Sequence, residues 1–143
     1  MSEPLVPADG WISVGRTADT RYFRKDPDVL FVVPDNGSKD TGASAEGNAD
    51  FQIRFAQEFG RPVAVVVRMT SLLSQDADAR RVYAARMEPT HFYAAALVAT
   101  SPISRAIASF FLGLTKPKFP TRVHDSYESA LDWISAIRAS TTT

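Results

Sequence analysis

The chain of 143 residues contains no cysteine, which excludes a disulfide, a thiolate nucleophile and a zinc site built on cysteine. Its charge is balanced as well, with 16 basic and 16 acidic side chains. Phosphate binding usually needs a basic excess, so we do not expect nucleic acid as a partner. No apolar run approaches the roughly 18 to 20 residues that span a bilayer, and residues 1–10 lack the pattern of a signal peptide. We therefore expect a cytoplasmic protein with no membrane span.

Residue sets that carry catalysis are also scarce. The chain has two histidines, and His91 has no histidine or carboxylate at helical ligand spacing. His124 precedes Asp125, a pair that predicts the end of a strand and a helix cap, because a catalytic dyad needs a third positioned group. The patterns G-x-S-x-G, H-E-x-x-H and G-x-G-x-x-G are absent. We expect no enzymatic activity, no metal site and no cofactor.

The length fits one domain with a sizeable core. We divide the chain into an N-terminal arm at 1–19 with an edge strand near 11–14, a domain at 20–139, and a disordered tail at 140–143. Residues 34–48 are rich in Gly, Ser, Asp and Asn and predict a mobile loop. This segment does not match the phosphate-binding pattern G-x-x-x-x-G-K-[ST], because its lysine precedes the second glycine.

The first half of the domain combines a hairpin with a helix. Residues 21–24 and 29–33 are two β-prone runs on either side of a turn-forming segment, which predicts a hairpin. Phenylalanines then recur at i, i+4 and i+8 within residues 49–59, a spacing that predicts an amphipathic helix.

The next segment is the clearest strand of the chain. Residues 61–69 are β-branched and apolar without polar alternation, which predicts a central strand that is buried on both faces. We expect a turn at 70–75 and a helix at 76–87, with acidic residues in its first turn. The predicted apolar face of this helix consists of Ala79, Val82, Tyr83 and Met87.

Residues 97–123 combine a strand, a capped helix, a proline-rich turn and a second strand. The run 93–99 predicts the buried strand, and Ser101 before Pro102 is a strong helix start. We expect the helix to end at Gly113. Its predicted apolar face consists of Ile103, Ala106, Ile107, Phe110, Phe111 and Leu114. A short strand at 121–123 and a last helix, capped by the D-x-x-E spacing that Asp125 begins, complete the domain.

Helices that alternate with strands after an initial hairpin predict an α/β domain whose mixed sheet has a parallel core. The stretch SPISRAIASFFLGLTKPKFPTRVHDSYESALDWI resembles the C-terminal half of the small bacterial STAS/SEC14 domain family, also called SpoIIAA-like. The matching residues are Ser101, Pro102, Ser104, Arg105, Phe110, Phe111, Leu112, Lys116, Pro117, Ala130 and Trp133. The resemblance extends from about 61 to 139. It implies a single domain with a mixed sheet of four to six strands and about four helices.

The resemblance also implies a regulatory protein-interaction module. In anti-sigma-factor antagonists of the STAS fold, a D-S-[ST]-G motif opens the helix after the central strand, and a partner kinase phosphorylates its serine. Here Asp76 matches the aspartate, whereas Ala77 and Asp78 occupy the hydroxyl positions, so the phosphoacceptor is absent. Either Asp78 supplies a fixed negative charge, or both acids only complement the helix N-terminus. The candidate partner-binding residues are Thr70, Ser71, Ser74, Asp76, Asp78 and Arg80.

The alternative function is a small-molecule or lipid-binding module, as the SEC14 part of the family name suggests. Its candidate residues are Arg105, Phe110, Phe111, Lys116 and Phe119, which combine an apolar slot with two cations. The simpler interpretation is that the aromatic residues pack on the sheet and the cations are solvated. A cavity of several hundred cubic ångströms, the usual size of a ligand pocket, would favour the ligand. Leu112 and Phe119 lie off the apolar face, and their exposure would permit a homodimer.

Overall fold

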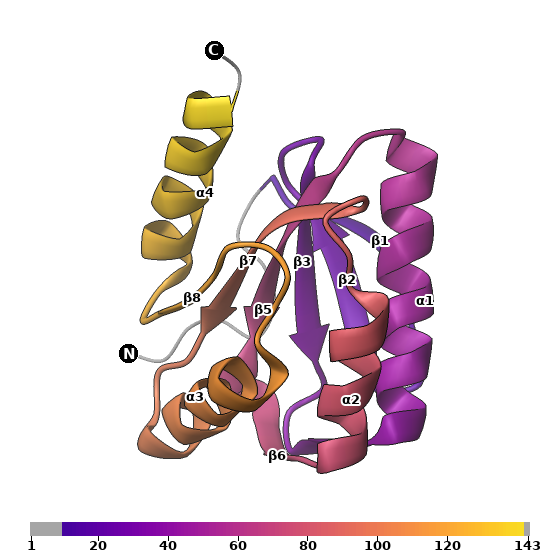
Figure 1. Ribbon diagram of the computed structural model, residues 1–143, viewed down its shortest axis with the longest axis vertical. Helices are drawn as coiled ribbons and strands as arrows, with labels where there is room; N and C mark the ends of the chain where they lie inside the picture. Colours follow the sequence, from indigo (N-terminus) through magenta and orange to yellow (C-terminus); the bar gives the residue numbers. More distant parts are fainter. Residues whose placement is uncertain (1–9, 142–143) are drawn as a thin grey trace.

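A computed structural model describes residues 10–141 and contains a six-stranded mixed sheet of order β1-β2-β3-β5-β7-β8 (Figure 1). Its strands are β1 (Ile12–Arg16), β2 (Thr20–Arg24), β3 (Val29–Pro34), β5 (Val63–Arg68), β7 (Phe92–Val98) and β8 (Thr121–His124). Strand β2 is antiparallel to both of its neighbours, β1 and β3, and the strands β3, β5, β7 and β8 are parallel. The predicted hairpin, the central position of β5 and the parallel core are therefore confirmed.

Helices cover both faces of the sheet. They are α1 (Gly42–Phe59), α2 (Ala77–Arg86), α3 (Pro102–Thr115) and α4 (Tyr127–Thr141), with a short 3₁₀ turn η1 (Met69–Ser71). Helix α4 packs on the face formed by residues such as Phe31 and Val66, whereas α1 packs on the opposite face, beside Val65. Helix α3 packs against η1 and the end of β7 on the α1 side (Figure 1). Strands β3, β5 and β7 are buried on both faces, which explains their largely apolar sequence.

The predicted N-terminal arm contains Trp11 and strand β1, both of which contact the sheet. Strand β1 pairs with β2 at the edge of the sheet, as predicted. The Trp11 ring stacks on the buried Phe31 ring at a centroid distance of 3.6 Å. Residues 1–9 of the arm lie outside the described part of the chain, as do 142–143 of the tail. Residues 140–141, which were expected to be disordered, belong to the last turn of α4.

The prediction of a mobile loop at 34–48 is wrong. This segment forms strand β4 (Ser38–Asp40), which pairs in parallel with β6 (Leu72–Gln75), and the first turns of α1. Thr41 caps α1 through a capping box, in which its side chain and that of Ser44 each accept the other's backbone N–H, at 3.2 Å and 2.8 Å. Small residues permit close packing here, since a Cβ added at Gly42 would lie 3.0 Å from the Asp78 Cβ. Helices α1 and α2 pack against each other, and the buried residues at the start of α1 include the small side chains Ala45 and Ala49.

Three predicted boundaries also differ from the structure. The segment 70–75 forms η1 and β6 instead of a turn. Helix α3 passes Gly113 and ends at Thr115, and its C-cap Lys116 has a φ of 49° in the left-handed region. The cap of α4 is Ser126, whose Oγ accepts the Ser129 N–H at 3.1 Å, so the predicted capping box that begins at Asp125 does not form.

Candidate functional site

Helix α3 presents a different face to the core from the one predicted. Four residues of the predicted apolar face are exposed: Ala106 and the larger side chains Ile103 (65 %), Phe110 (63 %) and Leu114 (61 %). The fully buried positions are Ser104, Ala108 and Thr115, and Ile107, Phe111 and Leu112 pack beside them. Ser104 is turned inward because it forms the capping box with Ser101. The apolar arc of α3 is therefore wider than the area that the sheet covers.

The predicted partner-binding residues do not form one surface. The Ser71 hydroxyl is buried and accepts a hydrogen bond from Arg68 Nη1 at 2.7 Å. Thr70 Oγ1 lies 3.0 Å from Thr100 Oγ1 and also accepts the Thr100 N–H. Ser74 is exposed, and Arg80 Nη1 donates to the Gln75 carbonyl at 3.0 Å.

The two acids of this set have different roles. Asp76 is the N-cap of α2, and its carboxylate accepts the Ala79 N–H at 2.8 Å. Asp78 lies in the first turn of α2 and pairs with Arg81, with both side chains largely exposed. The structure therefore supports the simpler interpretation for Asp76, a carboxylate that complements the helix N-terminus.

The predicted ligand-binding residues also separate. Phe111 and Phe119 line an interior cavity, whereas Phe110 points to the surface. Arg105 is exposed, and Lys116 forms the left-handed end of α3. The five residues therefore do not converge on one ligand.

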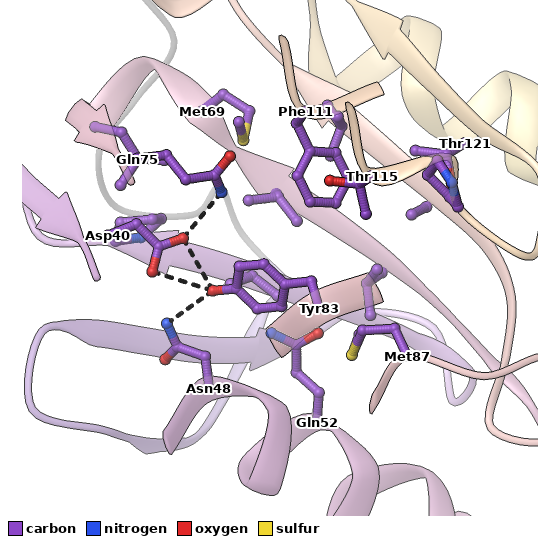
Figure 2. Close-up of a pocket in the computed structure, with 18 of the residues that line it drawn as sticks. Asp40, Asn48, Gln52, Met69, Gln75, Tyr83, Met87, Phe111, Thr115 and Thr121 are labelled. Carbon is purple, nitrogen blue, oxygen red and sulfur yellow. Dashed lines mark hydrogen bonds between the residues drawn. The ribbon is translucent and has the colours of Figure 1, made fainter. Parts of the chain in front are cut away.

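This cavity is partly open to solvent and lies between the sheet and helices α1, α2 and α3 (Figure 2). Its volume is about 80 Å³. A pocket for a drug-sized ligand has roughly 300 to 1,000 Å³, so this cavity is too small for a lipid chain. Its apolar walls include Val65, Val67, Met69, Leu97, Phe111 and Phe119.

A buried carboxylate lies at one end of the cavity. Asp40, at the end of β4, is only 7 % exposed and accepts hydrogen bonds from Ser44 Oγ at 2.7 Å and Gln75 Nε2 at 3.1 Å. The Tyr83 hydroxyl of α2 donates to both carboxylate oxygens, at 3.0 and 3.2 Å (Figure 2). Burial raises the pKa of Asp40 above its usual value of 3.8, and these three donors oppose the rise.

The hydrogen bonds continue from Tyr83 into α1 and the first hairpin. Asn48 Nδ2 donates to the Tyr83 hydroxyl at 3.4 Å, and Asn48 Oδ1 accepts from Tyr22 at 2.5 Å and from Thr17 at 2.8 Å. Burial raises the pKa of both tyrosines, so the two hydroxyls stay protonated. The network connects β4, β6, α1, α2 and the β1–β2 turn around one carboxylate.

Three residues that line the cavity each have a buried side-chain oxygen with no protein partner among residues 10–141: Ser38 Oγ, Gln75 Oε1 and Thr115 Oγ1. Gln75 uses its amide nitrogen on Asp40, which leaves its oxygen for another donor. Buried polar groups are normally hydrogen-bonded, either to protein or to ordered water.

The sequence did not reveal this network. Asp40 lies in the segment predicted as a loop, and Tyr83 was assigned to an apolar helix face. One signal was available, because the hydroxyl of a buried tyrosine usually finds a hydrogen-bond partner. Nothing in the sequence identifies that partner, which lies 43 residues away.

Groups that would suggest other functions do not assemble in the described part of the chain. Within it, no three histidine or carboxylate side chains converge to hold a metal ion. Its helices are each too short or too polar to cross a membrane. His124 Nδ1 lies 2.8 Å from Ser129 Oγ, so the neighbouring Asp125 does not orient its ring as in a dyad.

One comparison, with a solved structure, bears on the fold. The chain is similar to the crystal structure of an uncharacterized protein of the DUF3478 family with a SpoIIAA-like fold from Shewanella loihica PV-4. The TM-score is 0.50 and the sequence identity 13 %, over 90 % of this chain and 98 % of that chain. This match and the strand order confirm the SpoIIAA-like fold. A search of curated proteins gave no significant match. A family model described as a domain of unknown function, DUF7793, matches residues 26–138, and the chain belongs to that family.

Proposed function

We propose that the domain is a non-enzymatic protein-interaction module and that it forms a dimer through the outer face of α3. The observation that carries this proposal is the exposed apolar stripe of Ile103, Phe110 and Leu114. These residues are spaced i, i+7 and i+11, so they lie along one side of the helix. Large exposed apolar side chains that gather on one face are typical of a protein–protein contact.

A second copy of the chain is the occupant that fits this stripe. The net charge is zero, so two copies approach without long-range repulsion. A two-fold axis across α3 would place the same stripe of each copy against the other, as in most homodimers. The stripe replaces Leu112 and Phe119 as the basis for a homodimer, because both are partly buried in the core.

The fold supports an interaction role by analogy, since the anti-sigma-factor antagonists that it resembles act through protein contacts. The phosphorylatable serine of those proteins is absent here, and Asp78 is engaged with Arg81. We therefore propose an interaction that is not switched by phosphorylation at this turn.

Sedimentation velocity over a range of protein concentrations tests the dimer. We expect a concentration-dependent monomer–dimer equilibrium that Phe110→Ser weakens by at least about tenfold, or roughly 1.4 kcal/mol. The matched control is Ile12→Ser, which removes an apolar residue that is 54 % exposed on β1 and should leave the equilibrium unchanged. A wild-type chain that stays monomeric at about 1 mM, where the association would be weaker than about 4 kcal/mol, would contradict the proposal.

A further inference from the structure

We propose that the outer edge of β1 and the groove between β1 and α1 bind an extended segment of a partner protein that carries apolar and acidic side chains. This surface lies on other elements than the exposed stripe of α3, so the inference does not rest on the dimer. It combines three observations: a strand with a free edge, an apolar groove beside that strand, and arginines around the groove that have no carboxylate partner.

Strand β1 has a free edge. Within residues 10–141 it pairs with β2 on one side and with no strand on the other, and helix α1 lies beside it (Figure 1). Backbone N–H and C=O groups along such an edge can pair with one more strand, which is how several peptide-binding domains hold an extended segment. Because β1 is five residues long, the segment that adds to it is short as well.

The groove beside this edge has a volume of about 560 Å³, within the roughly 300 to 1,000 Å³ of ordinary binding pockets. At Gly15 an added Cβ would lie 2.9 Å from the Phe51 ring, so β1 and α1 are in contact there and the groove lies toward the start of β1. It can take the side chains of an extended segment, in which every second residue points to the same face. Its apolar lining comes from β1 and from three half-buried phenylalanines of α1: Ile12, Val14, Phe51, Phe55 and Phe59.

The charged residues around the groove favour acidic side chains in the partner. Arg24 and Arg54 line the groove, and the Arg61 guanidinium lies 5.1 Å from the centre of the Phe59 ring. None of these three arginines forms an ion pair within residues 10–141. Glu58, one helical turn after Arg54, is the single carboxylate in the lining and can offset one of them. Two cations therefore remain for acidic groups of the bound segment.

Amide NMR of the wild-type chain tests the inference with synthetic heptapeptides whose ends are blocked. The probe is ETLTLTE, in which one face of the strand carries two leucines between two acids and is the same in either strand direction. The control peptides are KTLTLTK, which reverses the charges, and ETSTSTE, which removes the apolar groups. We expect ETLTLTE to shift the Ile12, Ser13 and Val14 amide resonances in a saturable way and each control to bind at least about tenfold more weakly.

The matched variants are Arg54→Glu and Arg81→Glu. Both reverse one exposed charge, but Arg54 lines the groove, whereas Arg81 lies on α2 and pairs with Asp78. Arg54→Glu should weaken the binding of ETLTLTE by at least about fivefold, and Arg81→Glu should change it by less than about twofold.

The inference is overturned if ETLTLTE causes no saturable shift of the β1 amides, if either control peptide binds as well, or if the two variants change the affinity equally. It is also overturned if these amides shift with protein concentration when no peptide is present, because a second copy of the chain would then occupy the edge. The comparison of the three peptides uses the wild-type chain and holds even where a variant is unstable.

Discussion

The Tyr83 hydroxyl should contribute more to the free energy of unfolding than a hydroxyl that bonds a neutral group, because it donates to a buried carboxylate. In Tyr83→Phe, Asp40 loses a donor at 3.0 Å and Asn48 loses an acceptor at 3.4 Å. A hydrogen bond to a charged group contributes about 1.5 to 3 kcal/mol, so we expect a loss of about 2 kcal/mol at pH 7. For a domain of this length the midpoint of thermal unfolding should fall by roughly 5 to 10 °C.

The effect should depend on pH in a defined direction. Burial raises the pKa of Asp40 in the native state, so the free energy of unfolding decreases as the pH rises from about 3.8 through the raised pKa. Tyr83 opposes that rise by donating to the charged carboxylate, and in Tyr83→Phe the pKa of Asp40 rises further. The loss of stability should therefore be larger at about pH 7, where Asp40 is charged, than at about pH 4.

Urea unfolding at the two pH values measures both quantities. Tyr93→Phe is the matched control, since Tyr93 also donates to a carboxylate, Asp28 Oδ2, at 2.8 Å. In Tyr93→Phe, Asp28 keeps two hydrogen bonds from Arg138, at 2.8 and 3.1 Å. The free energy of unfolding of this control should therefore fall by about 1 kcal/mol or less. The reasoning is refuted if Tyr83→Phe lowers the free energy of unfolding by less than Tyr93→Phe does. It is also refuted if the loss in Tyr83→Phe is no larger at pH 7 than at pH 4.

Two further pairs of variants test local features by chemical denaturation. Gly15→Ala should destabilise the domain by more than about 1 kcal/mol, because Gly15 has a φ of 139° and an added Cβ would lie 2.9 Å from the Phe51 ring. Gly47→Ala, in open space within α1, should instead stabilise it by about 0.5 to 1 kcal/mol, and a change of the same sign in both would contradict the close approach at Gly15. Asp76→Ala removes the cap of α2 and should lower the free energy of unfolding by about 1 kcal/mol. Asp78→Ala should change stability by less than about 0.5 kcal/mol, since its pair with Arg81 is exposed, and a loss as large as that of Asp76→Ala would show a role for Asp78 that its contacts do not explain.

The features that the sequence predicted well are those that depend on neighbouring residues. The apolar run at 61–69 indicated a strand covered on both faces, and β5 lies at the centre of the parallel core. Ser101 before Pro102 indicated a helix start, and α3 begins there with a complete capping box. In each case the physical cause lies within a few residues of the chain, so the pattern is visible without the fold.

The prediction for residues 34–48 was wrong because the structure of this segment depends on contacts with distant residues. Its glycines and alanines resemble a loop, but they fit α1 closely against α2, where Gly42 adjoins Asp78. Strand β4 exists because β6 pairs with it, more than thirty residues away in the chain. A segment that is stabilised by close backbone packing has no apolar pattern of its own to reveal it.

The sequence by itself determined the fold class, the positions of the main strands and helices, and the absence of a sequence motif for catalysis. Tertiary structure alone decided which arc of α3 is buried, because the helix is apolar over a wider arc than the sheet covers. It also decided the site, since Asp40, Tyr83 and Thr115 meet at the cavity only when β4, α2 and α3 pack together. Hydrogen bonds between residues so far apart depend on that packing, and a linear pattern does not encode them.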